Sequence, residues 1–231
     1  MKTIAVMSGK GGVGKTTLSV TLADYFSRYE EERTVLINTD PQRSNDVWVS
    51  ARSDAQKRET AEREFAFELD TTLKEGTVMN LPRLAEKGFD RLIIDTSPRK
   101  DSNVFASIAD VADYIVVPTG QGDLDLASVI DTIRDVIRPS GCPFGVVLTN
   151  VRLEPKWKKE AQGIAERLRS KDVRVFATMI TNNPSYLLAT KWRKSIFTLP
   201  SSPPLRRAQR EMWDLCAELE EAMGSPAEAR P

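Results

Sequence analysis

A glycine-rich segment near the N-terminus, GKGGVGKTT from Gly9 to Thr17, constrains the fold more than any other feature of the sequence. It follows a short apolar run and precedes a long amphipathic stretch, and it fits the spacing GxxxxGK[ST]. Glycines let backbone N–H groups converge on a phosphate, and the N-terminus of the following helix adds its positive end. The segment therefore predicts a phosphate-binding loop between the first strand and the first helix.

Each residue of this loop has an expected contact with a nucleotide or its metal ion. Lys15 should reach the β- and γ-phosphates, the Thr16 hydroxyl should ligate Mg²⁺, and Thr17 can donate to the α-phosphate. The expected nucleotide-binding residues in the loop are Gly9, Lys10, Gly11, Gly12, Val13, Gly14, Lys15, Thr16 and Thr17.

Short β-branched apolar runs alternate with longer amphipathic stretches along the rest of the chain. The predicted strands are Thr3–Met7, Thr34–Thr39, Arg91–Asp95, Tyr114–Pro118, Phe144–Thr149 and Val173–Ile180, with Phe65–Leu69 left open as a further strand. The predicted helices are Lys15–Tyr29, Ser102–Val111, Leu124–Arg138, Lys158–Ser170 and Leu205–Met223. Several strands are continuously apolar, which is typical of strands covered on both faces. The alternation predicts an α/β fold with a doubly wound, mostly parallel sheet flanked by helices. We expect one domain over residues 1–231, with a frayed tail at 224–231.

The composition excludes several chemistries. The sequence has no histidine, which removes the Ser-His-Asp triad and imidazole acid/base catalysis. Cys142 and Cys216 are far apart in sequence, so there is no CxxC pair for zinc, an iron–sulfur cluster or redox exchange. No apolar run is long enough to span a bilayer, and the apolar stretch at the start is too short for a signal peptide. We therefore expect the chain in the cytoplasm.

Two acidic positions follow predicted strands. The segment NTDPQRS, from Asn38 to Ser44, ends the second strand, and RLIIDTSP ends another with Asp95. Phosphoryl transfer needs an oriented, in-line nucleophile and a metal ion held near the phosphates, and carboxylates can serve both needs. Taken alone, an Asp at the end of a strand is equally a cap or turn residue. Together with the loop, Asp95 is expected to hold Mg²⁺.

These motifs together resemble the ParA/MinD group of P-loop ATPases, whose deviant Walker A motif is KGGxGKT[TS] and whose fold is that of P-loop NTPases. The resemblance implies ATP and Mg²⁺ as cofactors. It also implies that Lys10 crosses a dimer interface to the partner's nucleotide and that Asp40 positions the attacking water. Asn38 stands where the family's DxDPQ motif has its first acid. This departure affects the ligands around Mg²⁺ and leaves ATP hydrolysis plausible. Pro98 matches the family's DxxP ending. The implied catalytic residues are Lys10, Lys15 and Asp40, and the implied metal residues are Thr16, Asp40 and Asp95.

The residues at the base end of the nucleotide are less specific. The resemblance places the base pocket near Val116–Thr119 and Val147–Asn150, so Asn150 is expected to hydrogen-bond the base. Asn after a strand is equally a turn former. Asp125, in GDLDL, resembles a family position near the dimer interface.

The charge distribution bears on the binding partner. The whole chain has 33 basic and 33 acidic residues, but residues 150–210 hold 14 basic and 4 acidic residues. Such a surplus suggests a face that binds a polyanion, although a solvated helix face is the alternative. The expected DNA contacts are Lys158, Lys159, Arg169, Lys191, Arg193 and Lys194. Trp157 and Trp192 are expected to pack and not to stack on bases.

The sequence thus predicts a small ParA-type ATPase for DNA partition or for positioning cargo. The resemblance implies a homodimer that closes on ATP, binds non-specific nucleoid DNA, and is released when a ParB-like or cargo-adaptor partner stimulates slow hydrolysis. One alternative is a MinD-like membrane-cycling ATPase, which needs a basic amphipathic C-terminal helix. This C-terminus, EMWDLCAELEEAMGSPAEARP, is acidic, so no stable membrane association is expected. A metabolic P-loop ligase of the same fold is a further alternative.

Overall fold

A central parallel sheet organises the computed structural model, which describes residues 1–39, 67–70, 81–97, 102–192 and 194–224. In this part of the chain the sheet has six strands in the order β3-β2-β4-β1-β5-β6, and every strand pair is parallel. The strands are β1 (Lys2–Val6), β2 (Thr34–Asn38), β3 (Glu68–Asp70), β4 (Arg91–Asp95), β5 (Tyr114–Thr119) and β6 (Phe144–Leu148). β1 lies between β4 and β5, so the direction of strand addition reverses on either side of it. The predicted sheet is confirmed.

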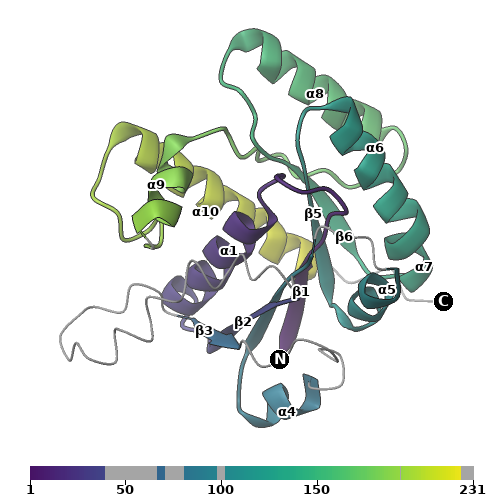
Figure 1. Cartoon of the computed structure of the whole chain (residues 1–231), viewed down its shortest axis with the longest axis vertical. Helices are drawn as coiled ribbons and strands as arrows, with labels where there is room; N and C mark the ends of the chain where they lie inside the picture. Colours follow the sequence, from purple (N-terminus) through teal and green to yellow (C-terminus); the bar gives the residue numbers. More distant parts are fainter. Residues whose placement is uncertain (40–66, 71–80, 98–101, 193, 225–231) are drawn as a thin grey trace.

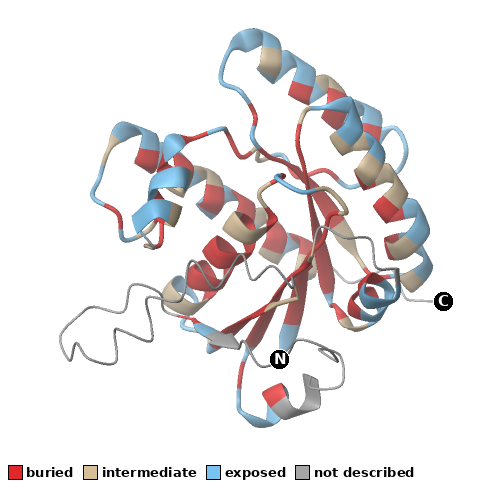
Figure 2. Cartoon of the chain, viewed as in Figure 1, coloured by how far each residue is buried: buried red, intermediate tan, exposed pale blue. Residues whose placement is uncertain are grey.

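Helices cover both faces of this sheet (Figure 1). They are α1 (Lys15–Tyr29), α4 (Leu81–Glu86), α5 (Ser102–Val111), α6 (Asp123–Thr132), the π-helical turn η2 (Ile133–Ile137), α7 (Arg138–Ser140), α8 (Pro155–Arg169), α9 (Pro184–Trp192) and α10 (Pro203–Gly224). Alternate side chains of β1 enter two apolar clusters. Ile4 and Val6 belong to the cluster that includes residues of α1 and α10, whereas Ala5 and Met7, the residue after β1, belong to the cluster that includes residues of α5 and α8. Burial on both faces explains the continuous apolar runs: β1, β2, β4, β5 and β6 are buried throughout most of their length (Figure 2).

The prediction of a strand at Val173–Ile180 is wrong. In the described structure this segment makes one isolated parallel bridge, between Val146 and Val175, a second bridge follows at Thr181, and no continuous strand forms. Carboxylates of α10 accept from backbone N–H groups in and just after the segment: Glu218 accepts from Ala177 and Thr178, and Glu211 accepts from Thr181, the next residue. These N–H groups are therefore not free to continue a ladder with β6.

The helices differ from the prediction in several places, and α4 was not predicted at all. The expected helix Leu124–Arg138 is divided into α6, the π-helical turn and α7. Pro139 has no N–H to donate to the carbonyl of Asp135, and the turn that precedes it is the π-helical one. α8 begins at Pro155, a residue favoured in the first turn, and α9 was not predicted. β3 places a strand where Phe65–Leu69 was left open, although the first residues of that range lie outside the described part.

Candidate nucleotide-binding site

The carboxyl ends of three neighbouring strands meet at one edge of the sheet. In the register of the sheet, Val6 at the end of β1 lies opposite Asp95 of β4 and Val116 of β5. This is the reversal point of the strand order, where parallel α/β sheets leave a crevice for ligands. The glycine-rich loop connects β1 to α1 at this point, so α1 directs its N-terminus toward the crevice.

The backbone of the loop depends on two of its glycines. Gly12 has φ +79° and Gly14 has φ +84°, values in the left-handed region that glycine adopts without a steric penalty. Gly14 is also the residue that precedes the first turn of α1, and its carbonyl accepts from the N–H of Leu18. The loop conformation thus explains why glycine stands at both positions.

Three side chains from two segments, the start of α1 and the end of β6, hold the loop through its carbonyl groups. The Lys15 ammonium, on a residue only 7% exposed, donates to the carbonyl of Lys10 at 2.8 Å. Thr149, at the end of β6, donates to the carbonyl of Val13 at 2.8 Å, and Asn150 donates to that of Gly12 at 3.2 Å. Because a carbonyl and the following N–H point in opposite directions, these bonds leave N–H groups of the loop available to an anion. The loop and its buried lysine fit a bound phosphate chain.

The predicted metal residues Thr16 and Asp95 are brought together. The Thr16 hydroxyl donates to Asp95 Oδ2 at 2.8 Å, and the Ser19 hydroxyl donates to Asp95 Oδ1 at 3.2 Å. Asp95 is buried at the end of β4. Hydroxyl and carboxylate oxygens are the ligand types that Mg²⁺ prefers, so this donor set fits the expected ion.

Ser19 was missed by the sequence reasoning. It lies three residues after Thr16 in α1, on the same face of the helix, and this i, i+3 spacing is the signal that could have found it.

The end of β2 lies beside the end of β4. Asn38 stands opposite Asp95 in the register, and the backbone N–H of Thr39 donates to the Asp95 carbonyl at 2.9 Å. Asn38, which stands where the DxDPQ motif has its first acid, is therefore a direct strand neighbour of Asp95, the candidate metal ligand. Asp40 and Pro98 lie outside the described residues, and the roles expected for Asp40 stay predictions.

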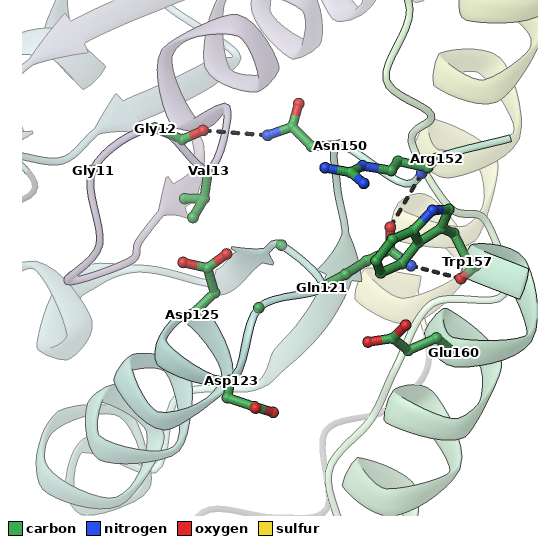
Figure 3. A pocket seen from close by; sticks show the side chains of 12 residues that line it. Gly11, Gly12, Val13, Gln121, Asp123, Asp125, Asn150, Arg152, Trp157 and Glu160 are labelled. Carbon is green, nitrogen blue, oxygen red and sulfur yellow. Dashed lines mark hydrogen bonds between the residues drawn. The ribbon is translucent and has the colours of Figure 1, made fainter. Parts of the chain in front are cut away.

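A pocket of about 410 Å³ lies beside the loop. Its walls are the loop, the start of α6 and the start of α8 (Figure 3). Gln121 joins two of these walls: its amide donates to the Trp157 carbonyl at 2.6 Å and accepts from the N–H of Arg152 at 3.1 Å. The Arg152 guanidinium lies over the Trp157 ring, 4.5 Å from its centroid. The lining residues are Gly11, Gly12, Val13, Gly120, Gln121, Gly122, Asp123, Asp125, Asn150, Arg152, Trp157 and Glu160.

Two residues singled out in the sequence belong to this pocket. Asn150 has φ +54° and so takes the turn conformation, and its amide is bonded to the loop; its contact with a base stays a prediction. Asp125 is directed toward the loop near Val13 (Figure 3). A Cβ at Gly120 would lie 2.3 Å from Asp125 Oδ2, so glycine is required there for this carboxylate to occupy its position.

The predicted DNA contacts lie on two separate helices. Lys158, Lys159 and Arg169 are exposed on α8, and Lys191 is exposed in the last turn of α9. In Figure 1, α8 and α9 lie on opposite sides of the loop. Arg169 also donates to the carbonyl of Val175 at 3.1 Å, so part of its guanidinium is engaged.

The other residues of the basic stretch meet different outcomes. Lys194 follows α9 and its N–H donates to the Ala189 carbonyl, whereas Arg193 lies outside the described residues. Trp157 packs under Arg152 as expected. Trp192 is 48% exposed, so about half of it is covered, and whether it packs or stacks on bases stays a prediction.

A glycine loop between β1 and α1, with a buried lysine inside it and a buried acid on the adjacent strand, defines a P-loop nucleotide-binding protein. The family comparison agrees. The chain belongs to the CobQ/CobB/MinD/ParA nucleotide binding domain family, whose model matches residues 4–191. It is thus a member of the ParA/MinD-like positioning ATPases, and the resemblance inferred from the sequence is confirmed.

Relatives of known name cover most of the chain. It is 34% identical over 184 residues to the maintenance of carboxysome distribution protein A of Gloeobacter kilaueensis, covering 78% of this chain and 76% of that one. It is 24% identical over 249 residues to the chromosome-partitioning ATPase Soj of Thermus thermophilus, covering 96% and 98%. A solved complex of Cyanothece McdA with ATP matches with a TM-score of 0.68 at 17% identity, covering 100% of this chain and 99% of that one.

A helix that crosses a bilayer must be both long and apolar. Among the helices in the described part of the chain, none has the length and apolar character that this requires.

Proposed function

We propose that this chain is an ATPase that positions DNA or another cargo inside the cell. The observation that carries the proposal is the contact between the Thr16 hydroxyl and the buried Asp95 carboxylate, beside a glycine loop that encloses Lys15. Relatives named for carboxysome distribution and for chromosome partitioning support the positioning role.

The hydrolytic part of the proposal uses residues around the loop. The Lys15 ammonium and the loop N–H groups bind the phosphates of ATP, and the oxygens of Thr16 and Asp95 hold Mg²⁺. The ion supplies positive charge that neutralises the phosphates. Asp40 orients the attacking water, and phosphoryl transfer depends mainly on such positioning, which makes slow basal hydrolysis the expected behaviour.

The proposed cycle also needs a second copy of the chain. Lys10 lies in the half-buried part of the loop, and its backbone N–H is fixed by the Ser8 hydroxyl at 3.4 Å. We propose that ATP closes a homodimer in which the Lys10 side chain completes the partner's nucleotide site. Asp125, at the pocket beside the loop, lies near that interface.

DNA binding follows from the exposed cations on α8 and α9. A dimer presents two sets of these residues, so it neutralises more phosphates than a monomer and binds DNA more tightly without reading bases. A ParB-like or cargo-adaptor protein then stimulates hydrolysis and releases the dimer. In this cycle the chain is on the nucleoid with ATP and elsewhere in the cytoplasm after hydrolysis.

The experiment that tests the proposal is binding to non-specific duplex DNA with ATP, with ADP and without nucleotide, across a salt series. We expect binding with ATP alone, falling steeply as salt rises because counterions are released. Lys158→Glu/Lys159→Glu and Lys191→Glu/Lys194→Glu should each weaken it and leave ATP hydrolysis unchanged. Lys87→Glu, an exposed change in the turn between α4 and β4, is the control.

Failure to bind DNA with any nucleotide, while ATP still drives dimerisation, would contradict the DNA step. Vesicles of anionic lipid are the next probe in that case. The C-terminal half of α10 carries Glu218, Glu220 and Glu221, so anionic lipid should repel it.

A further inference from the structure

Helix α9 has an internal side that is well fixed. Asn183 caps it, since the Ser185 N–H donates to Asn183 Oδ1 at 2.9 Å, and Pro184 occupies the first turn. Ser185 and Ala189 are its buried residues, and these small side chains let α9 lie close to the rest of the molecule. The Tyr186 hydroxyl donates to the carbonyl of Ala208 in α10 at 3.4 Å. These contacts fix which side of α9 faces the molecule, so the opposite side of the helix faces outward.

That outward side is apolar. Leu187 is 72% exposed, Leu188 is 40% exposed and Trp192 is 48% exposed. With Lys191 they occupy positions i, i+1, i+4 and i+5, which share one face of a helix. A single exposed leucine is ordinary on a protein surface, but three large apolar side chains on a nine-residue helix form a patch of the kind that binds partners.

The charges around this face have one sign. Between Val173 and Arg210 the sequence has no Asp or Glu and seven basic residues. One of them, Lys191, stands among the apolar side chains, and the pair Arg206–Arg207 opens α10, which packs against α9. A ligand that covers the leucines and Trp192 therefore meets only positive side chains from this stretch, and carboxylates on the ligand would match them.

We propose that the outward face of α9 is a docking site for an acidic amphipathic helix of a partner protein. The partner places apolar side chains at i and i+4 on Leu187, Leu188 and Trp192, in the manner of helix-in-groove recognition, and its carboxylates meet Lys191. α9 is about 13 Å long, so two to three turns of the partner suffice. DNA would satisfy the cations but leave the leucines uncovered, so the apolar side chains favour a protein, which would compete with DNA for Lys191. This site goes beyond the proposed function, because docking here needs neither DNA nor hydrolysis.

The test is a selection of displayed random 12-residue peptides on the full chain, with counter-selection on the Leu187→Ser/Leu188→Ser variant. This variant removes apolar surface and leaves the charge unchanged. Selected peptides are synthesised, and their affinity is measured by fluorescence anisotropy. We expect acidic sequences with large apolar residues at i and i+4, whose affinity falls at least tenfold in the variant. Lys191→Ala should also weaken them, most at low salt, and this effect should shrink as salt rises because salt screens the ionic contact that the variant lacks.

Two controls keep the result interpretable. Val104→Ser changes another exposed apolar residue, on α5, and should leave peptide affinity unchanged, and Trp192→Ser gives an independent variant of the same face. Circular dichroism checks that each variant folds. The proposal is overturned if no selected peptide depends on Leu187 and Leu188, or if the dependent peptides have no acidic excess. It is also overturned if Leu187→Ser/Leu188→Ser weakens DNA binding tenfold, because the face then belongs to DNA.

Discussion

At the scale of single residues, Lys15 places one nearly buried positive charge inside the loop. Its ammonium donates to a carbonyl of the loop, and we propose that it binds the phosphates of ATP. Lys15→Ala removes this charge, and nucleotide affinity should fall by roughly 10- to 100-fold, the range that one charge-assisted hydrogen bond accounts for. Calorimetric titration with Mg²⁺ and ATP measures the loss. Tight ATP binding that persists in Lys15→Ala would contradict the assignment of the loop.

Glu211 on α10 is the residue for which pH should matter. Burial raises the pKa of its carboxyl above the ordinary 4.5, although hydrogen bonds from Thr181 and the charges of Arg207 and Lys158 act to lower it. A raised pKa means that the ionised carboxylate costs stability in the fold, and that this cost is relieved as the pH falls through the raised value toward 4.5.

The pH dependence gives a prediction for Glu211→Gln, which keeps one acceptor oxygen for Thr181 and cannot ionise. Relative to the natural chain, this variant should gain stability as the pH rises from about 4.5 through the raised pKa. Urea unfolding at several pH values measures the difference. Glu166→Gln, an exposed change on α8, is the control. A difference that does not vary with pH would show that the ionised carboxylate carries no cost.

At the scale of elements, two glycines predict opposite effects of the same substitution. A Cβ at Gly145 in β6 would lie 2.7 Å from the Phe176 ring and 2.8 Å from the Tyr114 hydroxyl, so Gly145→Ala should cost about 1–3 kcal/mol by overpacking. Gly163 in α8 has no atom within 4 Å of the same position, and Gly163→Ala should gain about 0.5–1 kcal/mol by restricting the unfolded chain. Denaturant unfolding of both variants gives the comparison. Equal effects would contradict the packing described for β6.

Whether an element could be predicted depended on how its pattern arises. β1, β2, β4, β5 and β6 were predicted because burial on both faces leaves an apolar run in the sequence. α9 was not, since its buried side holds Ser185 and Ala189 while its leucines face outward, which inverts the usual helical pattern. The segment Val173–Ile180 has the composition of a strand, but the carboxylate that accepts from its Ala177 and Thr178 N–H groups is that of Glu218, 41 and 40 positions away.

The candidate site was predictable only where its residues stand in a sequence motif. Lys15, Thr16 and Asp95 stand in motifs whose spacing predicts their roles, and the structure brings Thr16 and Asp95 together. Thr149 and Gln121 stand in no such motif. Their hydrogen bonds, to Val13 and to Trp157, join segments that only the folded chain brings close.

At the scale of the whole molecule, the proposed dimer makes a prediction about mixtures. Lys10→Ala should remove the residue that acts on the partner's nucleotide, and Asp40→Ala should remove the residue that orients water, so each variant alone should hydrolyse ATP poorly. A mixed dimer has one site with its own Asp40 and the partner's Lys10. Mixing equal amounts should therefore restore roughly a quarter of the natural rate, because half of the dimers are mixed and each has one complete site.

Phosphate release from the separate variants and from the mixture measures this rescue. Two copies of the same variant, mixed after separate purification, are the control and should stay inactive. A mixture no more active than its components would contradict the exchange of Lys10 between subunits.

The bonds from Thr149, Asn150 and Lys15 to carbonyls of the glycine loop have a consequence for the entropy of binding. Glycine-rich segments have many accessible conformations in solution, and ordering them on a ligand would consume part of the binding free energy. Here the chain orders its own loop through β6 and α1, so this loss is taken during folding. The stability of β6, a strand at the edge of the sheet, is thereby linked to nucleotide affinity. A substitution that destabilises β6 would lower the affinity for phosphate without contacting the nucleotide.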